Sequence, residues 1–422
     1  MKLQRILLGV LAIIELILFI LFRENIIDLF PFLQESSEGH YDDLLVNIAA
    51  TLIYIFFQGI NWCIIKLVFK FKKLFFTLIS YFFEIRKKLI LKDIVNMLGF
   101  TFSIRVKWGP NVNSEEPKIA NIAEALISSI DAIDAGIELS PVYKSSLTQI
   151  AIKLLNMMTE DGYKSYNENV YTVHCTSMAL YALKRCDDLG LISISQRKKQ
   201  LINKCLKKLL CNSSDLGWGF ENKTYSDQKY IRVFSTIWAL KALNIWGYSN
   251  HKTFVKIFNN LTNNSDGLVG FSPSTKERPT TTAMLYLFVE ELQNNTLKKQ
   301  YLESIQKRNI IRFLCFNIPE IEVERYNIDV GYNNTRSWTH MSECFVIKTL
   351  IKNLSDLNIV QITKMAWRIK KMRDKIDKNR YYYVANMMNV ISADPPFYPT
   401  SYAISTFCSL INTSNGYINM DN

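Results

Sequence analysis

Cationic and aromatic side chains recur just before several predicted helices or in their first turns. The set is Trp218, Tyr225, Lys229, Tyr230, Arg232, Lys276, Arg278, Arg336, Trp338 and His340. Guanidinium and ammonium groups beside aromatic rings, with helix N-termini pointing the same way, suit an anionic ligand with an apolar body. The alternative is ordinary solvation of loops in a basic chain. We predict that these residues bind such a ligand where they meet at one mouth.

Patterns for acid–base or metal chemistry are weaker. Glu124, Asp131 and Asp134 form an acidic stripe on one predicted helix, which we interpret as a solvated face rather than an acid pair. His340 and Cys344 lie four residues apart and Asp329 precedes them, but an isolated pair of this kind usually packs inside the protein. We therefore predict no metal and no cofactor, and the sequence leaves open whether the chain is an enzyme.

Composition describes a large basic chain with reduced cysteines. The 422 residues are 49% hydrophobic, and 50 Lys and Arg against 38 Asp and Glu give a net charge of +12. The basic residues of the second half are scattered, whereas the densest cluster adjoins an apolar run, so we predict no nucleic-acid partner. The eight cysteines form no CxxC pair.

Two apolar runs near the N-terminus predict a transmembrane hairpin within residues 1–65. The runs are 6–22 and 44–65, and the second is about 33 Å long as a helix, enough to cross a bilayer. The segment between the runs has one basic and six acidic residues, while 66–92 has eight basic residues and one acidic. The positive-inside rule places the N-terminus and everything after the hairpin in the cytoplasm, at the cell membrane.

Polar residues interrupt both predicted membrane helices. They are Glu15, Asn47, Gln58 and Asn61. We interpret them as pairing across the hairpin, and the alternative is a polar path in an assembly of several copies. Residues 66–117 follow as a basic amphipathic helix at the membrane interface and a polar linker.

The rest of the chain repeats one unit. A turn of Gly and aromatic residues, a polar loop and an apolar helix recur at 161–183, 216–246, 266–289, 329–350 and 381–410. Such a period is typical of repeats that bury their apolar faces on each other. Six apolar helices alternate with five that have a basic side, including one at 297–315 and an apolar one at 337–353.

This alternation predicts an all-α fold, an (α/α)6 toroid over residues 118–412, followed by a C-terminal tail at 413–422. A helix that is apolar nearly all round belongs inside, and one with a charged side faces water. The alternative is an open solenoid of helix pairs.

The sequence Gly217-Trp218-Gly219-Phe220, followed by the helix at 235–243, resembles the repeat of class II terpene cyclases and protein prenyltransferase β subunits. The likeness covers about residues 118–412. It implies the (α/α)6 toroid, with loops around a central cavity for an isoprenoid. The chain departs from the cyclases because it lacks Asp-x-Asp-Asp, and from the prenyltransferases because Asp329-Val-Gly replaces Asp-x-Cys.

From this resemblance we expect a membrane-anchored cytoplasmic toroid without catalytic motifs, which binds a ligand or partner as a sensor coupled to the hairpin. One alternative is a membrane enzyme acting on an isoprenoid or other lipid-like substrate, and another is a structural subunit of a membrane complex. The expected partners are the lipid bilayer, an isoprenoid-like or anionic ligand, and either a partner protein or further copies of the chain.

Overall fold

A computed structural model of the chain describes residues 87–101, 118–165, 170–264, 266–316, 318–329, 332–379, 381–384 and 398–418. All of them belong to one compact unit, Glu84–Asn422. The two predicted transmembrane helices, with Glu15, Asn47, Gln58 and Asn61, lie outside the described residues, as does most of the basic segment at 66–92. Within the described residues, no helix is both long and apolar enough to cross a membrane.

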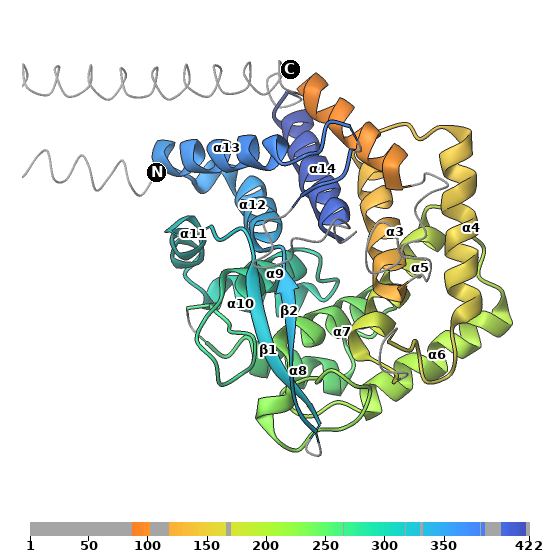
Figure 1. The fold of residues 1–422 in the computed structure, drawn as a ribbon. Helices are drawn as coiled ribbons and strands as arrows, with labels where there is room; N and C mark the ends of the chain where they lie inside the picture. The colour runs from red at the N-terminus through yellow and green to blue at the C-terminus, as the bar shows by residue number, and fades with distance from the viewer. Residues whose placement is uncertain are drawn as a thin grey trace, which may run out of the picture. The chain divides into compact units, whose positions relative to one another are not determined.

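Six helices of the described chain form an inner ring (Figure 1). They are α3 (Ile119–Asp134), α5 (Val173–Asp188), α7 (Val233–Ile245), α9 (Pro279–Glu290), α12 (Ser342–Lys352) and α14 (Tyr398–Ile418). Each contacts the next along the chain, and α14 contacts α3, so the ring closes. The prediction of an α/α toroid is confirmed, and the alternative of an open solenoid is wrong.

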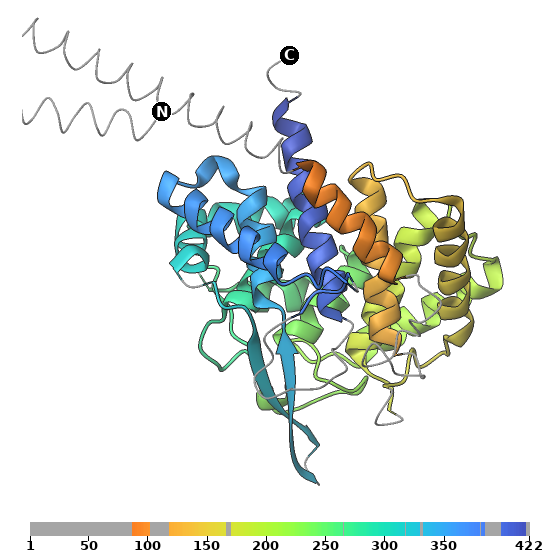
Figure 2. The same ribbon diagram turned by 45° about the horizontal axis from the view of Figure 1, so that its top comes forward.

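A second set of helices lies outside this ring (Figure 2). It comprises α4 (Pro141–Met157), α6 (Gln196–Cys211), α8 (Lys252–Leu261), α10 (Asn295–Ser304), α11 (Lys307–Phe316) and α13 (Ile359–Asp374). Eleven of the 12 residues of α9 are buried, compared with five of the 16 in α6. The predicted division into inner and outer helices is therefore confirmed. The helix predicted at 297–315 is two helices, α10 and α11.

The turns of Gly and aromatic residues connect outer helices to inner ones. Gly217 has φ of +124°, and a Cβ there would lie 2.3 Å from Thr236 Oγ1, so the turn requires glycine. The backbone N–H of Trp218 donates to Thr236 Oγ1 at 3.0 Å, and its indole N–H donates to the Leu209 carbonyl of α6 at 2.8 Å. The same threonine contact recurs in four repeats, as Tyr163–Thr176, Trp218–Thr236, Val269–Thr282 and Tyr383–Thr400.

The all-α prediction misses a β-hairpin. Strands β1 (Glu322–Asp329) and β2 (Tyr332–His340) pair antiparallel, with Val323 opposite Thr339 and Glu324 opposite Trp338. The helix predicted from residue 337 begins at Ser342 instead. The reason is that Trp338 and His340 alternate with Ser337 and Thr339 in a strand-like pattern that continues the ladder to its end.

Candidate functional site

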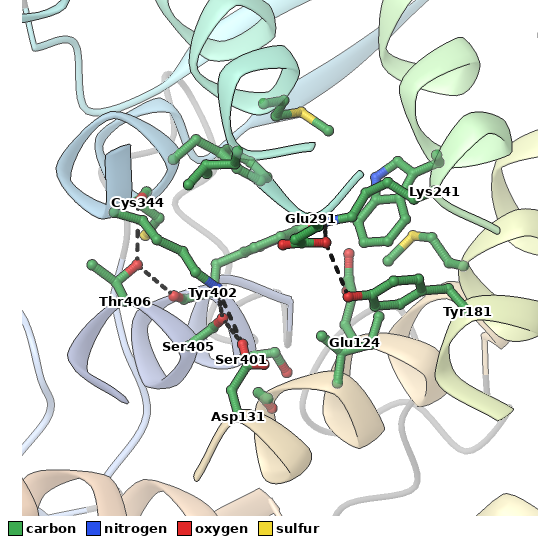
Figure 3. Close-up of a pocket in the computed structure, with 18 of the residues that line it drawn as sticks. Glu124, Asp131, Tyr181, Lys241, Glu291, Cys344, Ser401, Tyr402, Ser405 and Thr406 are labelled. Carbon is green, nitrogen blue, oxygen red and sulfur yellow. Dashed lines mark hydrogen bonds and ion pairs between the residues drawn. The ribbon is translucent and has the colours of Figure 1, made fainter. Parts of the chain in front are cut away.

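A pocket lies inside the ring, and every inner helix contributes to its wall (Figure 3). It encloses about 740 Å³ of space free of atoms, part of it open to solvent. The charged and polar residues on the wall are Glu124, Ser128, Asp131, Tyr181, Arg185, Lys241, Glu291, Lys348, Ser401, Tyr402, Ser405 and Thr406. Apolar and aromatic side chains, including Trp238 and Phe345, complete it. Such a mixture suits a ligand held by a few oriented polar groups.

Glu124 of α3 is a carboxylic acid that keeps its proton at neutral pH. Burial raises its pKa to about 8, although a hydrogen bond with Tyr402 and the charge of Lys118 act in the opposite direction. Its Oε2 atom has no hydrogen-bond partner among the described residues. A neutral carboxyl on a cavity wall can donate a proton to a bound molecule.

Two other carboxylates on the wall are held in ion pairs. Lys241 Nζ lies 3.0 Å from Glu291 Oε2. Burial alone would raise the pKa of Glu291, but the charges of Lys241, Lys352 and Lys348 outweigh it and hold the pKa at about 2. Asp131 lies 3.2 Å from Lys348 Nζ. The pocket therefore contains a protonated acid and at least one ionised carboxylate. The surroundings of these two groups shift their pKa values in opposite directions.

A network of hydrogen bonds joins opposite sides of the ring. The Tyr181 hydroxyl donates to Glu291 Oε2 at 3.2 Å, and Arg185 donates to the Tyr181 oxygen at 3.2 Å. Arg185 also lies 3.7 Å from Asp131. Asp131 belongs to α3, and Glu291 follows α9, three helices further around the ring. These hydrogen bonds and ion pairs hold the side chains on both walls in place without a bound ligand.

A second cavity continues the pocket toward the C-terminal ends of the inner helices. It shares Asp131, Tyr181, Arg185, Glu291 and Lys348 with the first cavity and contains about 970 Å³ of space free of atoms, part of it open to solvent. Among the further lining residues, Asp134, Asn244 and Lys352 lie in the last turns of α3, α7 and α12, while Cys408, Ser409 and Asn412 lie further from the end of α14. The mouth of the pocket is therefore at this end of the ring.

The opposite end of the ring, where the predicted ligand-binding residues lie, is closed by the hairpin. Arg232 and Glu324 form a bidentate ion pair at 2.9 and 2.7 Å, with each side chain 3% exposed. His340 Nε2 lies 2.8 Å from Glu324, and Trp338 packs on His174. Although burial raises the pKa of Glu324, Arg232 and His340 hold it at about 2. The structure thus brings three predicted residues together, with Arg232 and His340 buried and Trp338 half-buried.

A second hairpin carboxylate joins the same end of the ring to α9. Glu322 accepts hydrogen bonds from the Thr280 backbone N–H at 2.8 Å and from its hydroxyl at 2.7 Å. Arg278, another predicted residue, lies 3.9 Å from Glu322 and is half exposed. Because the Thr280 N–H belongs to the first turn of α9, Glu322 occupies a position where a helix N-terminus favours an anion.

The remaining predicted residues do not converge. Trp218 is fully buried in its turn, and Tyr225 stacks on Tyr230 with ring centroids 5.6 Å apart. Lys229 pairs with Asp227 at 2.9 Å on the surface. Lys276 is exposed, and the side chain of Arg336 lies outside the described residues. No comparison tests ligand binding by these side chains, so it stays a prediction.

Metal-ligand geometry is not found in the described parts of the chain, where no group of three or more His, Cys, Asp or Glu side chains could hold an ion. His340 pairs with Glu324, while Cys344 lies separately on the pocket wall. Burial raises the pKa of the Cys344 thiol, and the neighbouring Glu343 raises it further. A buried, protonated thiol of this kind is a poor metal ligand.

Sequence reasoning missed the pocket acids. The stripe of Glu124, Asp131 and Asp134 was interpreted as a solvated face, but the first two line the pocket and Glu124 is buried. A solvated face and a pocket wall can be distinguished by the composition of α3, which has no basic residue among its 16. Carboxylates on an otherwise apolar helix indicate burial at a site rather than a water-facing surface.

Solved structures similar to this chain include α-mannanases of the GH76 type. The α-1,6-mannanase GH76A of Salegentibacter sp. HEL1_6, in an inactive variant bound to α-1,6-mannotriose, is similar over 77% of this chain and 99% of its own, with 13% identity and a TM-score of 0.51. The GH76 α-mannanase of Bacteroides thetaiotaomicron is similar over 79% and 97%, with 12% identity and a TM-score of 0.51. The chain shares the α/α toroid fold of these enzymes. No protein-family model and no curated protein matches the chain.

These matches correct the predicted family. The resemblance to terpene cyclases and prenyltransferases is wrong, because the similar structures are α-mannanases and no terpenoid cyclase is among them. The membrane-anchored sensor predicted from that resemblance is overturned with it, as are the isoprenoid enzyme and the structural membrane subunit. The predicted location and partners are not tested and stay predictions.

Proposed function

We propose that this chain is a glycoside hydrolase that takes a saccharide into the pocket inside the ring. The observation that carries the proposal is Glu124, a protonated carboxyl on the same wall as the carboxylate of Asp131. Glycoside hydrolysis uses one carboxylic acid and one carboxylate. The fold shared with two α-mannanases supports the same reaction class.

In this proposal Glu124 donates its proton to the glycosidic oxygen while the bond from that oxygen to the sugar carbon breaks. A water molecule, from which Asp131 or Glu291 accepts a proton, supplies the new oxygen on that carbon. Glu124 and Asp131 lie seven residues apart on α3, a rise of about 10 Å along the helix, and both line the pocket.

Buried hydrogen-bonding groups on the pocket wall suit a ligand rich in hydroxyls. Besides Glu124 Oε2, the indole N–H of Trp238 and the hydroxyl of Ser401 have no hydrogen-bond partner within the described residues. Such buried groups are few in folded proteins, and a group of them on one wall points to a polar ligand. An α-mannoside is the first class to test, because the similar enzymes include complexes with α-1,6-mannotriose and α-1,6-mannotetrose.

The acids of this pocket differ in arrangement from those replaced in the inactive mannanase variants, which carry changes at two consecutive aspartates. The consecutive aspartates of the described chain, Asp187 and Asp188, end α5. Asp187 accepts a hydrogen bond from the Ile194 backbone N–H, and Asp188 pairs with Lys184. Our proposal therefore rests on Glu124 and Asp131 and carries over no residue from those enzymes.

The test is release of reducing ends from α-1,6-linked mannotriose and a panel of other glycosides by the purified full chain. Glu124→Gln should lower the rate about 10²- to 10⁴-fold, the range for loss of a general acid. The matched control is Glu160→Gln, which removes an exposed carboxyl paired with Lys204 and should leave the rate unchanged. Equal rates in wild type and Glu124→Gln would refute the proposed role.

Saccharide binding without hydrolysis is the second candidate function. It is favoured by the ion pairs of Asp131 with Lys348 and of Glu291 with Lys241, because a carboxylate held by a lysine is a weaker base. Binding of mannotriose detected by calorimetry, without any release of reducing ends, would select this candidate.

A further inference from the structure

The exposed aromatic side chains of the described residues lie on or near two neighbouring outer helices. They are Phe316, Trp367 and Tyr381, which are 85%, 50% and 38% exposed. Phe316 ends α11, Trp367 lies in α13, and Tyr381 follows α13 by a few residues. The two helices pack against each other (Figure 1). Large apolar side chains that gather on one part of a surface, unlike single ones, indicate a binding surface.

Trp367 lies at the centre of the face that α13 exposes to solvent. The exposed residues within about 60° of it around the helix axis are Val360, Thr363, Lys364, Lys370, Lys371 and Asp374. The opposite face of α13 is buried. The ammonium group of Lys371 lies 3.7 Å from the centre of the Trp367 ring, and the guanidinium of Arg368 lies 5.4 Å from it. The indole is therefore exposed between cations.

The same two helices have an excess of basic residues. α13 has five basic residues and one acidic residue, and α11 has three basic residues and no acidic one. Two of these eight cations are paired with acids, Lys307 with Asp356 and Arg373 with Asp93. The other six form no ion pair within the described residues: Arg308, Arg312, Lys364, Arg368, Lys370 and Lys371. Charge complementarity therefore favours an anionic partner.

Comparison with α6 shows that exposed cations alone do not make such a surface. α6 has six basic residues and no acidic one, and none of the large apolar side chains that are exposed in the described chain lies on it. It is an ordinary solvated outer helix. α13 differs because it exposes Ile359, Val360 and Trp367 among its cations.

A further helix, at residues 87–101, is attached to the end of α13. Arg373 Nε donates to Asp93 Oδ2 at 2.6 Å. The exposed residues of this helix are again cations and apolar side chains, namely Lys88, Leu89, Lys92 and Val95. In the sequence it continues the basic segment 66–92, which we predict to lie at a membrane interface.

We infer that the exposed face of α13, together with Phe316 at the end of α11, contacts a lipid surface with anionic headgroups. Lysine and arginine are attracted to such headgroups, and tryptophan and tyrosine are enriched where headgroups meet acyl chains. The chain's own segment 66–92 does not complement this face, because it has eight basic residues and one acidic. The inference requires no transmembrane helix, and it is independent of the reaction proposed for the pocket.

The experiment measures how strongly vesicles of bromine-labelled lipid, which quench on contact, quench the tryptophan fluorescence of the full chain. Vesicles of phosphatidylcholine with about one third phosphatidylserine are compared with vesicles of phosphatidylcholine alone. Because the chain has seven tryptophans, the contribution of Trp367 is the difference between wild type and Trp367→Phe. We expect the anionic vesicles to quench wild type more strongly than Trp367→Phe, and the neutral vesicles to quench both equally.

The lysines around Trp367 are tested in the same assay. A variant that combines Lys364→Gln, Lys370→Gln and Lys371→Gln loses three positive charges from the exposed face of α13. Quenching of this variant by the anionic vesicles should fall to the level of Trp367→Phe, because the attraction to the headgroups is lost.

The matched control removes the same amount of charge from α6. It combines Arg197→Gln, Lys199→Gln and Lys207→Gln, three exposed positions, and should be quenched as strongly as wild type. Equal quenching of wild type and Trp367→Phe by the anionic vesicles overturns the inference. A difference between these two proteins that persists with neutral vesicles overturns it as well, because the contact would then not depend on anionic headgroups.

Discussion

The two ends of the inner ring use similar residues for different purposes. At the N-terminal ends of the helices, Arg232 is buried and paired with Glu324 of β1, which also pairs with His340 of β2. At the other end, the pocket opens past Asp131 and Lys352, and Glu124 below them keeps a proton and an unpaired oxygen. Buried atoms without a hydrogen-bond partner occur at both ends, because Nδ1 of His340 and both ring nitrogens of His174 lack one within the described residues. The comparison teaches that the ends differ in what their groups face: the closed-end groups pack on one another, whereas Glu124 lies on the wall of a cavity.

The largest effect should come from breaking the buried pair at the closed end. Glu324→Gln leaves the Arg232 guanidinium buried without its carboxylate, and we expect a loss of about 3–5 kcal/mol in the free energy of unfolding. Urea denaturation measures it. Removing Lys204, whose exposed pair with Glu160 serves as the control, should cost about 0–1 kcal/mol. A loss below 1 kcal/mol for Glu324→Gln would mean that the hairpin is not held by this pair.

The second effect concerns the pH dependence of stability at the open end. Glu124 keeps its proton in the folded state up to about pH 8, while the unfolded chain releases it near the ordinary value of 4.5. Wild-type stability should therefore fall between these pH values, by about 1.4 kcal/mol for each pH unit, relative to Glu124→Gln. Denaturation of both proteins from pH 4.5 to 8 measures the difference, and a constant difference would show that Glu124 is ionised when folded.

A smaller effect should follow from changing one repeat turn. Trp218→Phe keeps an aromatic ring but removes the indole N–H that donates to the Leu209 carbonyl. We expect a loss of about 1–3 kcal/mol, because a buried carbonyl is left unsatisfied. Since Trp218 lies outside the pocket wall, saccharide binding by the folded protein should be unchanged. Weaker binding with unchanged stability would instead support the ligand-binding role predicted from the sequence.

The smallest effect should be at the exposed loop beside the closed end. Lys229→Ala removes only a surface pair with Asp227, so the free energy of unfolding should not change measurably. Ligand affinity should not change either. A clear loss of affinity in titrations would place the binding site at the predicted residues and would reverse the comparison between the two ends.

Much of the ring could be predicted from the sequence because its signals are local. Apolar helices, glycine turns and charged outer faces each depend on residues a few positions apart, and α9 and α6 follow the expected difference in burial. The hairpin could not be predicted in this way. Glu322 and Glu324 stabilise it through contacts with Thr280 and Arg232, residues about 40 and 90 positions away.

The pocket was harder to predict than the ring. The spacing of Glu124 and Asp131 places them on one helix face but does not say whether that face meets water or a cavity. Closure of the ring decides this, because the contact between α14 and α3 encloses the face. The pKa of Glu124 likewise depends on burial by neighbours distant in the sequence.

The threonine contacts at the turns have a consequence for how this protein can change. Thr176, Thr236, Thr282 and Thr400 each accept a hydrogen bond from a backbone N–H in the turn of their own repeat, and none of them contributes to the pocket wall. Each of these four inner helices thus has one threonine that binds its turn and other residues that line the pocket. Side chains that line the cavity can therefore change in evolution while these hydrogen bonds remain. The same fold can in this way come to bind new ligands.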